Sequence, residues 1–366
     1  MWRARERREN WLAPSIRRVS CAVIRGVHLY GPLLRAVIAS AANDHRLGAN
    51  EAPPAILSVY LGDQLEAVFN DIKEGNIAVS SDSGVMDLGL SQILPFTRDP
   101  GDRNRTSPFA FTGNRFEFRA VGSSQSVLGP LVAMNTTLAD SLNWIADKLE
   151  AVLADDKSQV EAVATVLQEL MQLHGNVIFG GDGYSTEWHT MAVEERGLRN
   201  IPTTADALPA LIDPVVVALF ERIGVLSPVE LESRYEVYSE QYILSIDVEA
   251  KTTAEIAKTM LYPAAMAYVS DLVGSISGAA SIGVEIDTLI VKTIAGEANS
   301  LLAAVGALES ALALHDFETT EEHMRYCAGT LRGLMDQVRL HGDALESEVA
   351  DTYWPLPKYR EMLFMK

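Results

Sequence analysis

The 366-residue sequence predicts an α+β protein, with a partial antiparallel sheet followed by a large helical domain. Two observations support this fold class. Residues 115–121 alternate charged and apolar side chains, and a period of two is typical of a β-strand. From residue 127 onward, apolar residues recur at steps of three and four, which is the spacing of amphipathic helices. A domain boundary is therefore expected near residue 126, separating residues 19–126 from residues 127–366.

The region before this boundary combines helices, loops and a strand. A helix is predicted over Val19–Ala42, a polar loop over Asn43–Pro53 and a second helix over the apolar stretch Ile56–Phe69. Ser80–Arg105 is rich in Gly, Ser, Asp and Pro, so loops are expected there, with one short apolar segment at Ile93–Phe96.

The region after the boundary is expected to be almost entirely helical. A glycine-rich loop interrupts it at His174–Thr186, and Pro202–Asp206 indicates a helix start. The predicted helical segments are Val127–Leu153, Gln159–Leu173, Val229–Val269, Thr288–Leu314 and Glu321–Val349.

Composition excludes several classes of protein. The formal net charge of −19 argues against a nucleic-acid partner, because neutralising phosphates requires clustered Lys and Arg. Cys21 and Cys327 lie far apart without a CxxC spacing, which predicts two buried thiols and fits a reducing cytoplasm. The best membrane-span candidate, Val19–Ser40, carries Arg25 and Arg35, so no membrane-spanning stretch is expected.

Three charged side chains share one face of the predicted strand. Alternation places Arg115, Glu117 and Arg119 on one face and Phe116 and Phe118 on the other. A carboxylate between two arginines suits a site where a divalent cation meets phosphate oxygens, with Glu117 as metal ligand. The alternative is a solvated strand face with ordinary ion pairs.

Two loops add candidate residues. Arg103 and Arg105 bring two more guanidiniums close to the strand, which suggests an anionic partner, although a basic surface loop paired with carboxylates would look the same. In residues 43–54, Arg46 could clamp a carboxylate and Glu51 could act as a general base. The alternative for this segment is a capped surface loop before a helix.

These motifs, taken in order, resemble those of glutamine synthetases. They are Asn43–Arg46 followed by Glu51–Pro53, then Arg103–Thr106, then Arg115–Arg119. The amino-acid sequences of these segments are similar to those of the large type III class. The similarity runs from about residue 19 to the C-terminus. Later stretches that share it are residues 180–185, 234–238 and 353–357.

The resemblance implies roles on the amino-acid side of the reaction. Arg46 matches an arginine that binds the carboxylate of glutamate, and Arg119 matches one that serves glutamate and released phosphate. Glu51 matches the flap glutamate that takes a proton from ammonium. The expected substrates are therefore glutamate, ammonia and ATP.

The resemblance also implies roles on the nucleotide side. Arg105 matches an arginine that steadies the transferring phosphoryl group, and Arg115 matches one near the nucleotide phosphates. Glu117 matches a ligand of the Mg²⁺ or Mn²⁺ ion that bridges ATP and glutamate. Glutamate would attack ATP to give γ-glutamyl phosphate, which ammonia displaces, in a cytoplasmic homo-oligomer that the family implies is a dodecamer.

The sequence departs from the family pattern in two places that bear on activity. A second phosphate-clamping arginine of the shorter bacterial enzymes is Ala110 here. The upstream half, with its β-grasp domain and remaining metal ligands, is not matched, so a truncated chain that is inactive by itself is expected. Residues 1–18 match nothing in the family and carry six arginines: Arg3, Arg5, Arg7, Arg8, Arg17 and Arg18.

Two other functions are compatible with the sequence. One is a non-catalytic paralogue or fragment that keeps the fold and oligomer contacts. The other is a related ligase that joins ammonia or an amine to a different carboxylate. Retention of Arg46, Glu51 and Glu117 weighs against a non-catalytic paralogue. Arg46 and the loop Asn50–Pro53 favour glutamate as the substrate.

Overall fold

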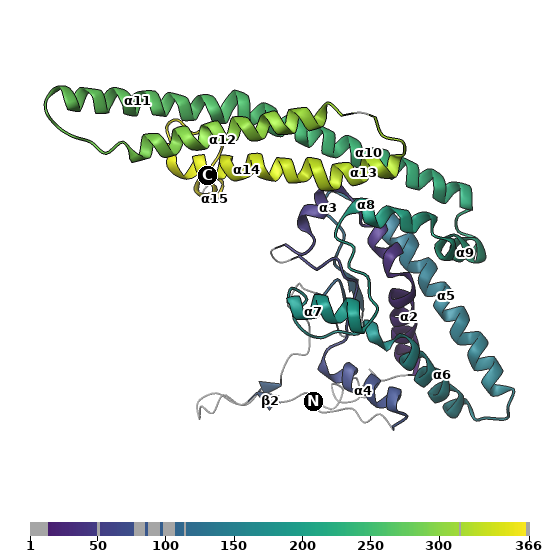
Figure 1. Ribbon diagram of the computed structural model, residues 1–366. Coiled ribbons are helices and arrows are strands. Elements are labelled where there is room, and N and C mark those ends of the chain that lie inside the picture. Colours follow the sequence, from purple (N-terminus) through teal and green to yellow (C-terminus); the bar gives the residue numbers. More distant parts are fainter. Residues whose placement is uncertain are drawn as a thin grey trace. The chain divides into compact units, whose positions relative to one another are not determined.

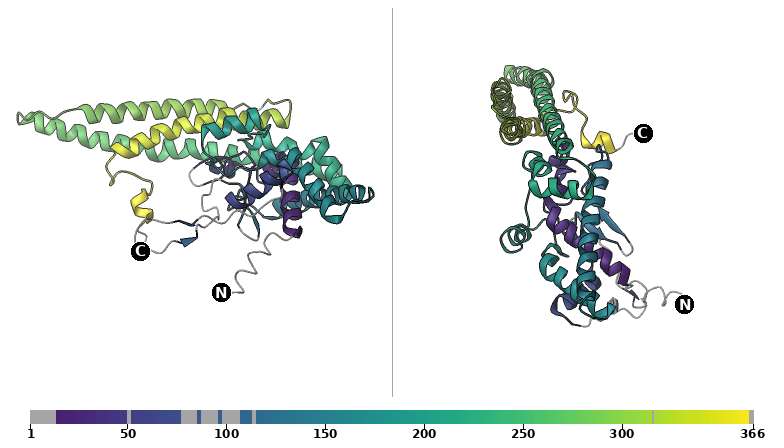
Figure 2. Two further views of the ribbon diagram at one scale, coloured as in Figure 1. Left: turned by 90° about the horizontal axis from the view of Figure 1, so that it is seen from below. Right: turned by 90° about the vertical axis from the view of Figure 1, so that its right-hand side faces the viewer.

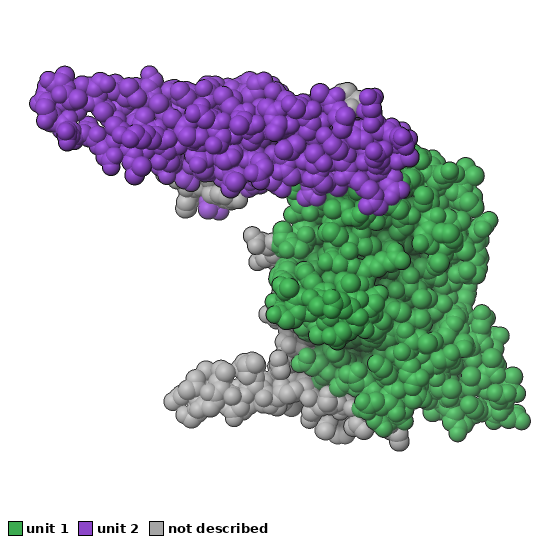
Figure 3. Space-filling view, in the orientation of Figure 1, with its two compact units in different colours: residues 1–236 green, residues 237–366 purple. Residues whose placement is uncertain are grey.

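The computed structural model divides into two compact units, residues 1–236 and residues 237–366 (Figure 3). It describes residues 14–49, 52–76, 85–86, 96–97, 107–112, 115–314 and 316–363. Helices dominate the described chain and a small mixed sheet lies in the first unit, which confirms the predicted α+β class. The boundary predicted near residue 126 concerns family domains and stays a prediction, because strands and helices on both sides of it belong to the first unit.

The first helix is shorter than predicted and is bent. α2 spans Pro14–Ala36, and Tyr30 within it has the non-helical angles φ −117° and ψ 22°. Pro32 explains the kink, because proline supplies no N–H and its ring crowds the preceding turn. The helix predicted to continue to Ala42 therefore ends at Ala36. A separate six-residue helix, α3 (Ala41–Arg46), follows where a loop was predicted, and the Ser40 side chain caps it.

The apolar stretch Ile56–Phe69 is divided between a strand and a helix, so the prediction of one helix there is wrong. β1 covers Val59–Tyr60 and α4 covers Asp63–Glu74. Gly62 separates them with φ 79°, a conformation that glycine adopts without steric strain. A continuous apolar run does not by itself distinguish a buried strand from a helix, which is why the prediction failed.

Three short strands form the sheet beside the candidate site. β4 (Phe109–Phe111) is central, pairing parallel with β1 and antiparallel with β5 (Phe116–Phe118). The sheet is therefore mixed, whereas an antiparallel one was predicted. Phe109 contacts the rings of Phe116 and Phe118 at centroid distances of 5.8 and 5.4 Å, which fixes the apolar side of the hairpin. β2 (Val85–Met86) and β3 (Phe96–Thr97) form a separate antiparallel pair.

The helices of the first unit pack against one another. α2 lies against α5 (Leu128–Leu153) and α6 (Gln159–His174), as Figure 1 shows. Both helices begin and end within one residue of their predicted bounds. The remaining elements of the unit are η2 (Gly175–Val177), α7 (Thr186–Thr190), η3 (Met191–Glu195), α8 (Thr204–Ala207), η4 (Leu208–Ile212) and α9 (Pro214–Ile223).

The second unit is built from long helices. α10 (Pro228–Ile256) begins in the first unit and continues into the second, and α12 (Leu289–Leu312) lies alongside α11 (Tyr262–Ser281) and α14 (Arg332–Glu348) (Figures 1 and 2). The other elements are η5 (Ala257–Leu261), α13 (Thr320–Tyr326), η6 (Cys327–Leu331) and α15 (Tyr359–Leu363).

Two composition-based predictions meet different outcomes. Cys21 and Cys327 are free and fully buried, as predicted. Helix α12 is long and apolar enough to cross a membrane by length and composition alone, with 22% of its most apolar stretch buried, so the expectation that no stretch has this length and composition is not met. A single helix of this kind is weak evidence of a membrane span, and the expectation that the chain does not span a membrane stays a prediction. Within its unit, Ile294, Leu301 and Leu308 of this helix are buried.

Candidate functional site

The charged face predicted for the strand is present on β5. Glu117 lies between two arginines: its Oε1 accepts from Arg115 Nη2 at 2.8 Å and its Oε2 accepts from Arg119 Nη2 at 3.1 Å. Thr112 Oγ1 donates a further hydrogen bond to Oε1 at 3.3 Å. The side chain of Arg115 is 72% exposed and that of Arg119 is 20% exposed, so the arrangement faces solvent on one side and protein on the other.

These arginines hold Glu117 in its charged form. Hydrogen bonds from Arg115 first, and then from Arg119, lower the pKa of Glu117 from its usual value against an opposing effect of burial. An ionised carboxylate flanked by guanidiniums can ligate a hard cation while the arginines bind phosphate oxygens. The same geometry also satisfies the simpler interpretation of intra-strand ion pairs.

A second group of residues reaches the end of β5 from α3. Asn43 is buried and donates from Nδ2 to the carbonyl oxygens of Ile38 and Ala120, at 2.7 and 2.9 Å. Arg46 donates to the Ala120 oxygen at 3.1 Å and to the Arg119 oxygen at 3.0 Å. The structure therefore brings Arg46 and Arg119 together, although they lie 73 positions apart in the sequence.

The contacts of Arg46 leave a binding face on its guanidinium. Nη1 donates to oxygens of Asn43 and Ala120, and Nη2 donates to the Arg119 oxygen. Nε–H has no partner among the described residues, and Nη2 carries two hydrogens for one acceptor among them. Nε and Nη2 share one edge of a guanidinium, which is an edge that can bind a carboxylate bidentately.

Two of the six predicted site residues, Glu51 and Arg105, lie outside the described residues. The other four form one connected group, because Arg46 binds the backbone of Arg119 and Glu117 pairs with both Arg115 and Arg119. Within the described chain, no group of three or more His, Cys, Asp or Glu side chains is placed to hold a metal ion.

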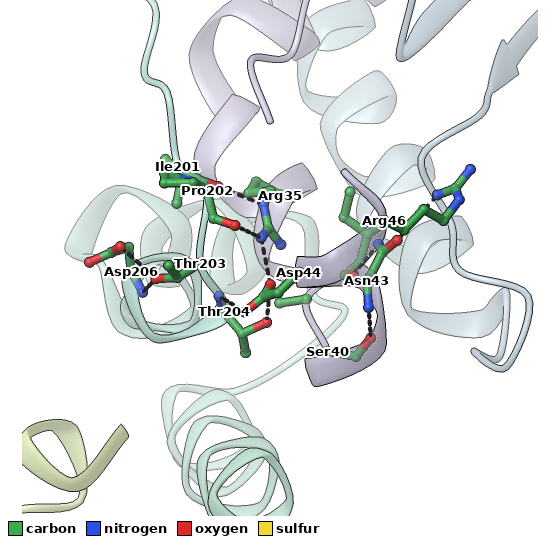
Figure 4. A network of polar contacts seen from close by, with 12 residues as sticks. Arg35, Ser40, Asn43, Asp44, Arg46, Ile201, Pro202, Thr203, Thr204 and Asp206 are labelled. Atoms are coloured by element: carbon green, nitrogen blue, oxygen red, sulfur yellow. Dashed lines mark hydrogen bonds and ion pairs between the residues drawn. The ribbon is translucent and has the colours of Figure 1, made fainter. Parts of the chain in front are cut away.

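Sequence reasoning assigned no function to Asp44, which is buried beside the site (Figure 4). Its carboxylate accepts from Arg35 Nη2 at 3.0 Å and from the backbone N–H of Thr204 at 2.8 Å. The available signal was an acidic residue within the Asn43–Arg46 motif. Its partner Thr204 lies 160 positions away, so no spacing could reveal the pair.

Comparisons with known proteins point to a single family. Residues 162–279 match the glutamine synthetase C-terminal domain. A type-3 glutamine synthetase from Dictyostelium discoideum is 38% identical over 354 residues, which cover 94% of this chain and 48% of that protein. A glutamine synthetase from Bacteroides fragilis is 36% identical over 357 residues, covering 94% of the chain and 49% of the relative.

The chain therefore belongs to the glutamine synthetase family. Within that family it is similar to the type III class, as its sequence motifs indicated. A further glutamine synthetase, from Butyrivibrio fibrisolvens, is 34% identical over 348 residues, which cover 94% of the chain and 49% of that relative. The chain spans about half the length of these curated relatives.

Proposed function

We propose that this chain supplies one wall of an active site that ligates ammonia to L-glutamate with ATP, giving L-glutamine through γ-glutamyl phosphate. The observation that supports this most directly is the connection of Arg46 to Arg119 beside Glu117. It places Arg46, which can bind a carboxylate, beside the Arg119–Glu117 pair, which can bind a phosphate group and a metal ion. Family membership supports the choice of reaction.

In this proposal, Arg46 and Arg119 bind the amino-acid substrate. The Nε–H and Nη2–H of Arg46 would hold a carboxylate of glutamate, while its other donors keep the guanidinium fixed to the backbone of Arg119 and Ala120. Arg119 would contact glutamate and the phosphate that is released after the transfer. Glu51 would take a proton from ammonium, so that ammonia can attack the activated carboxylate.

Arg105 would steady the transferring phosphoryl group, Arg115 would bind the nucleotide phosphates, and Glu117 would hold a divalent cation. Glu117 fits Mg²⁺ or Mn²⁺ as one oxygen ligand, because Mg²⁺ commonly uses one or two carboxylates together with phosphate and water oxygens. The bound ion would neutralise phosphate charge. We propose that this chain by itself turns over slowly at most, because Glu117 supplies only one of the several oxygen ligands that a catalytic Mg²⁺ or Mn²⁺ site requires.

We further propose a homo-oligomer in the cytoplasm, with a dodecamer as the family expectation. Two buried, free cysteines are compatible with a reducing compartment. The strongly negative net charge continues to argue against a nucleic-acid partner. Sedimentation of the purified protein at several concentrations tests the assembly, and a concentration-independent monomer would contradict it.

Calorimetric titration with a phosphinic glutamate analogue in the presence of Mg²⁺ and ATP tests the proposed reaction class. We expect saturable binding that requires both ATP and the cation. Absence of binding would favour a non-catalytic paralogue, while equal binding of unrelated carboxylate analogues would favour a different ligase. A γ-glutamyl transferase assay on the same chain completes the test, since rapid turnover would refute the proposed incompleteness of the metal site.

A further inference from the structure

The short helix α3 makes hydrogen bonds on two opposite sides. One side carries Asn43 and Arg46, which bind carbonyl oxygens at the end of β5. The other side carries Asp44, which meets Arg35 and Thr204 (Figure 4). A helix of six residues has little stability by itself, so these tertiary contacts determine where it lies.

The contacts of Asp44 are short and fully enclosed. Its Oδ1 accepts from Thr204 Oγ1 at 2.7 Å and from Arg35 Nη2 at 3.0 Å, and its Oδ2 accepts from the Thr204 N–H at 2.8 Å. The side chains of Arg35 and Asp44 are 1% and 0% exposed. Charge-assisted hydrogen bonds in such an environment are strong and directional, so small displacements of α3 are disfavoured.

Arg35 extends the network to the segment before Thr204. Its Nε donates to the Ile201 oxygen at 2.8 Å, and its Nη2 donates to the Pro202 oxygen at 3.1 Å. Residues 201–204 are therefore fixed to both α2 and α3. They belong to the stretch that matches the C-terminal domain of the family.

We propose that Asp44 and Thr204 are positioning residues for the carboxylate-binding face of Arg46 and Arg119. The contacts run from Thr204 to Asp44, through α3 to Arg46, and from Arg46 to the backbone of Arg119 and Ala120. Residues 201–204 thus set the position of two arginines that they do not touch. The consequence for substrate binding rests on the proposed function, whereas the structural coupling does not.

Thr204→Val is the central test, because it removes the hydroxyl and keeps the shape and the backbone N–H. Amide hydrogen exchange on the full chain reports the coupling. We expect the Leu47 amide, which donates to Asn43, and the Arg119 amide, which donates to Pro108, to exchange roughly tenfold faster or more. Thr204→Ser keeps the hydroxyl and should restore wild-type exchange.

Thr203→Val is the matched control. Its hydroxyl caps α8 by accepting from the Asp206 N–H and does not contact Asp44. This variant should speed exchange in α8 and leave Leu47 and Arg119 unchanged. Equal effects of the two valine variants at Leu47 and Arg119, or no effect of Thr204→Val there, would overturn the positioning role.

Titration with the phosphinic glutamate analogue plus Mg²⁺ and ATP then tests the link to substrate. We expect Thr204→Val to bind the analogue several-fold more weakly, while Thr203→Val and Thr204→Ser bind as the wild type does. If the wild type fails to bind, the proposed function fails and the exchange data still decide the coupling. If Thr204→Val binds normally while exchange at Arg119 is faster, the positioning role is overturned.

Discussion

The Nδ1 atoms of His28 and His174 lie 2.8 Å apart, joining α2 to the end of α6. A single proton between the two nitrogens gives a hydrogen bond, whereas two protonated rings at this distance would repel each other. Trp144 meets the His174 ring edge-on at 6.3 Å, and the Arg25 guanidinium lies over Trp144 at 5.2 Å. Burial and the nearby Arg25 guanidinium disfavour additional positive charge on this pair.

This pair predicts a loss of stability in mild acid. Burial first, and then the nearby His28 and Arg25 charges, lower the pKa of His174 from 6.5 to about 4; burial also lowers the pKa of His28. Because the unfolded chain binds protons at higher pH than the native chain, stability falls as the pH drops from about 6.5 to about 4. The loss due to His174 is on the order of 3 kcal/mol at most.

Urea unfolding at pH 7 and pH 5 measures this effect. His174→Gln should reduce the difference in unfolding free energy between the two pH values. Leu173→Gln, at the exposed position beside His174, provides the comparison: it changes no titratable group and should leave the difference as in the wild type. A His174→Gln variant with an unchanged pH dependence would show that this pair is not the cause.

Asp140 of α5 should be among the residues whose loss destabilises the first unit most. Its Oδ2 accepts from Arg25 Nη1 and from the Tyr30 hydroxyl, both at 2.8 Å, and its Oδ1 accepts from Arg222 Nη2 at 2.6 Å. Asp140→Asn would leave the buried Arg25 without its counter-charge, so we expect a loss of roughly 3–5 kcal/mol in unfolding free energy. The exposed Asp147→Asn on the same helix should change it by about 0.5 kcal/mol or less. Comparable losses in the two variants would contradict the role of the network.

Two glycine-to-alanine substitutions should change the free energy of unfolding in opposite directions. Gly75 ends α4 with φ 79°, and a Cβ there would lie 2.7 Å from Gln168 Nε2, so Gly75→Ala should lower stability by about 1 kcal/mol or more. Gly296 lies within α12, and a Cβ there meets no atom within 4 Å. Gly296→Ala should therefore raise stability by about 0.5–1 kcal/mol. Denaturant unfolding of both variants decides the signs, and two changes of the same sign would show that backbone conformation and local space do not control these positions.

How much of the fold could be predicted depended on the range of the interactions. Helices α5 and α6 and the charged face of β5 follow from the periodicity of neighbouring residues, and the structure confirms them. The division of Ile56–Phe69 between β1 and α4 depends on Gly62 and on pairing with β4, whose partner residues lie 50 positions later. Local periodicity contains no information about that pairing.

The candidate site shows the same limit. Arg46, Arg115, Glu117 and Arg119 were identified from motifs, and the described structure connects them. Asp44 was missed because its partners are Arg35, in a different helix, and Thr204, far along the chain. Burial of an acidic side chain becomes visible only when these distant segments come together.

Arg46→Lys tests whether geometry or charge matters at the proposed carboxylate site. Lysine keeps the positive charge but cannot bind the oxygens of Arg119 and Ala120 while offering two parallel donors to a substrate. We expect the affinity for the phosphinic glutamate analogue to fall about 10–100-fold, as for loss of one to two strong charge-assisted hydrogen bonds.

Arg115→Lys is the matched control, because Arg115 is largely exposed and lies on the proposed nucleotide side. It should weaken ATP binding and, with ATP raised to saturation, leave the affinity for the analogue within about threefold of wild type. An Arg46→Lys variant that binds the analogue as tightly as wild type would show that α3 does not form the carboxylate site.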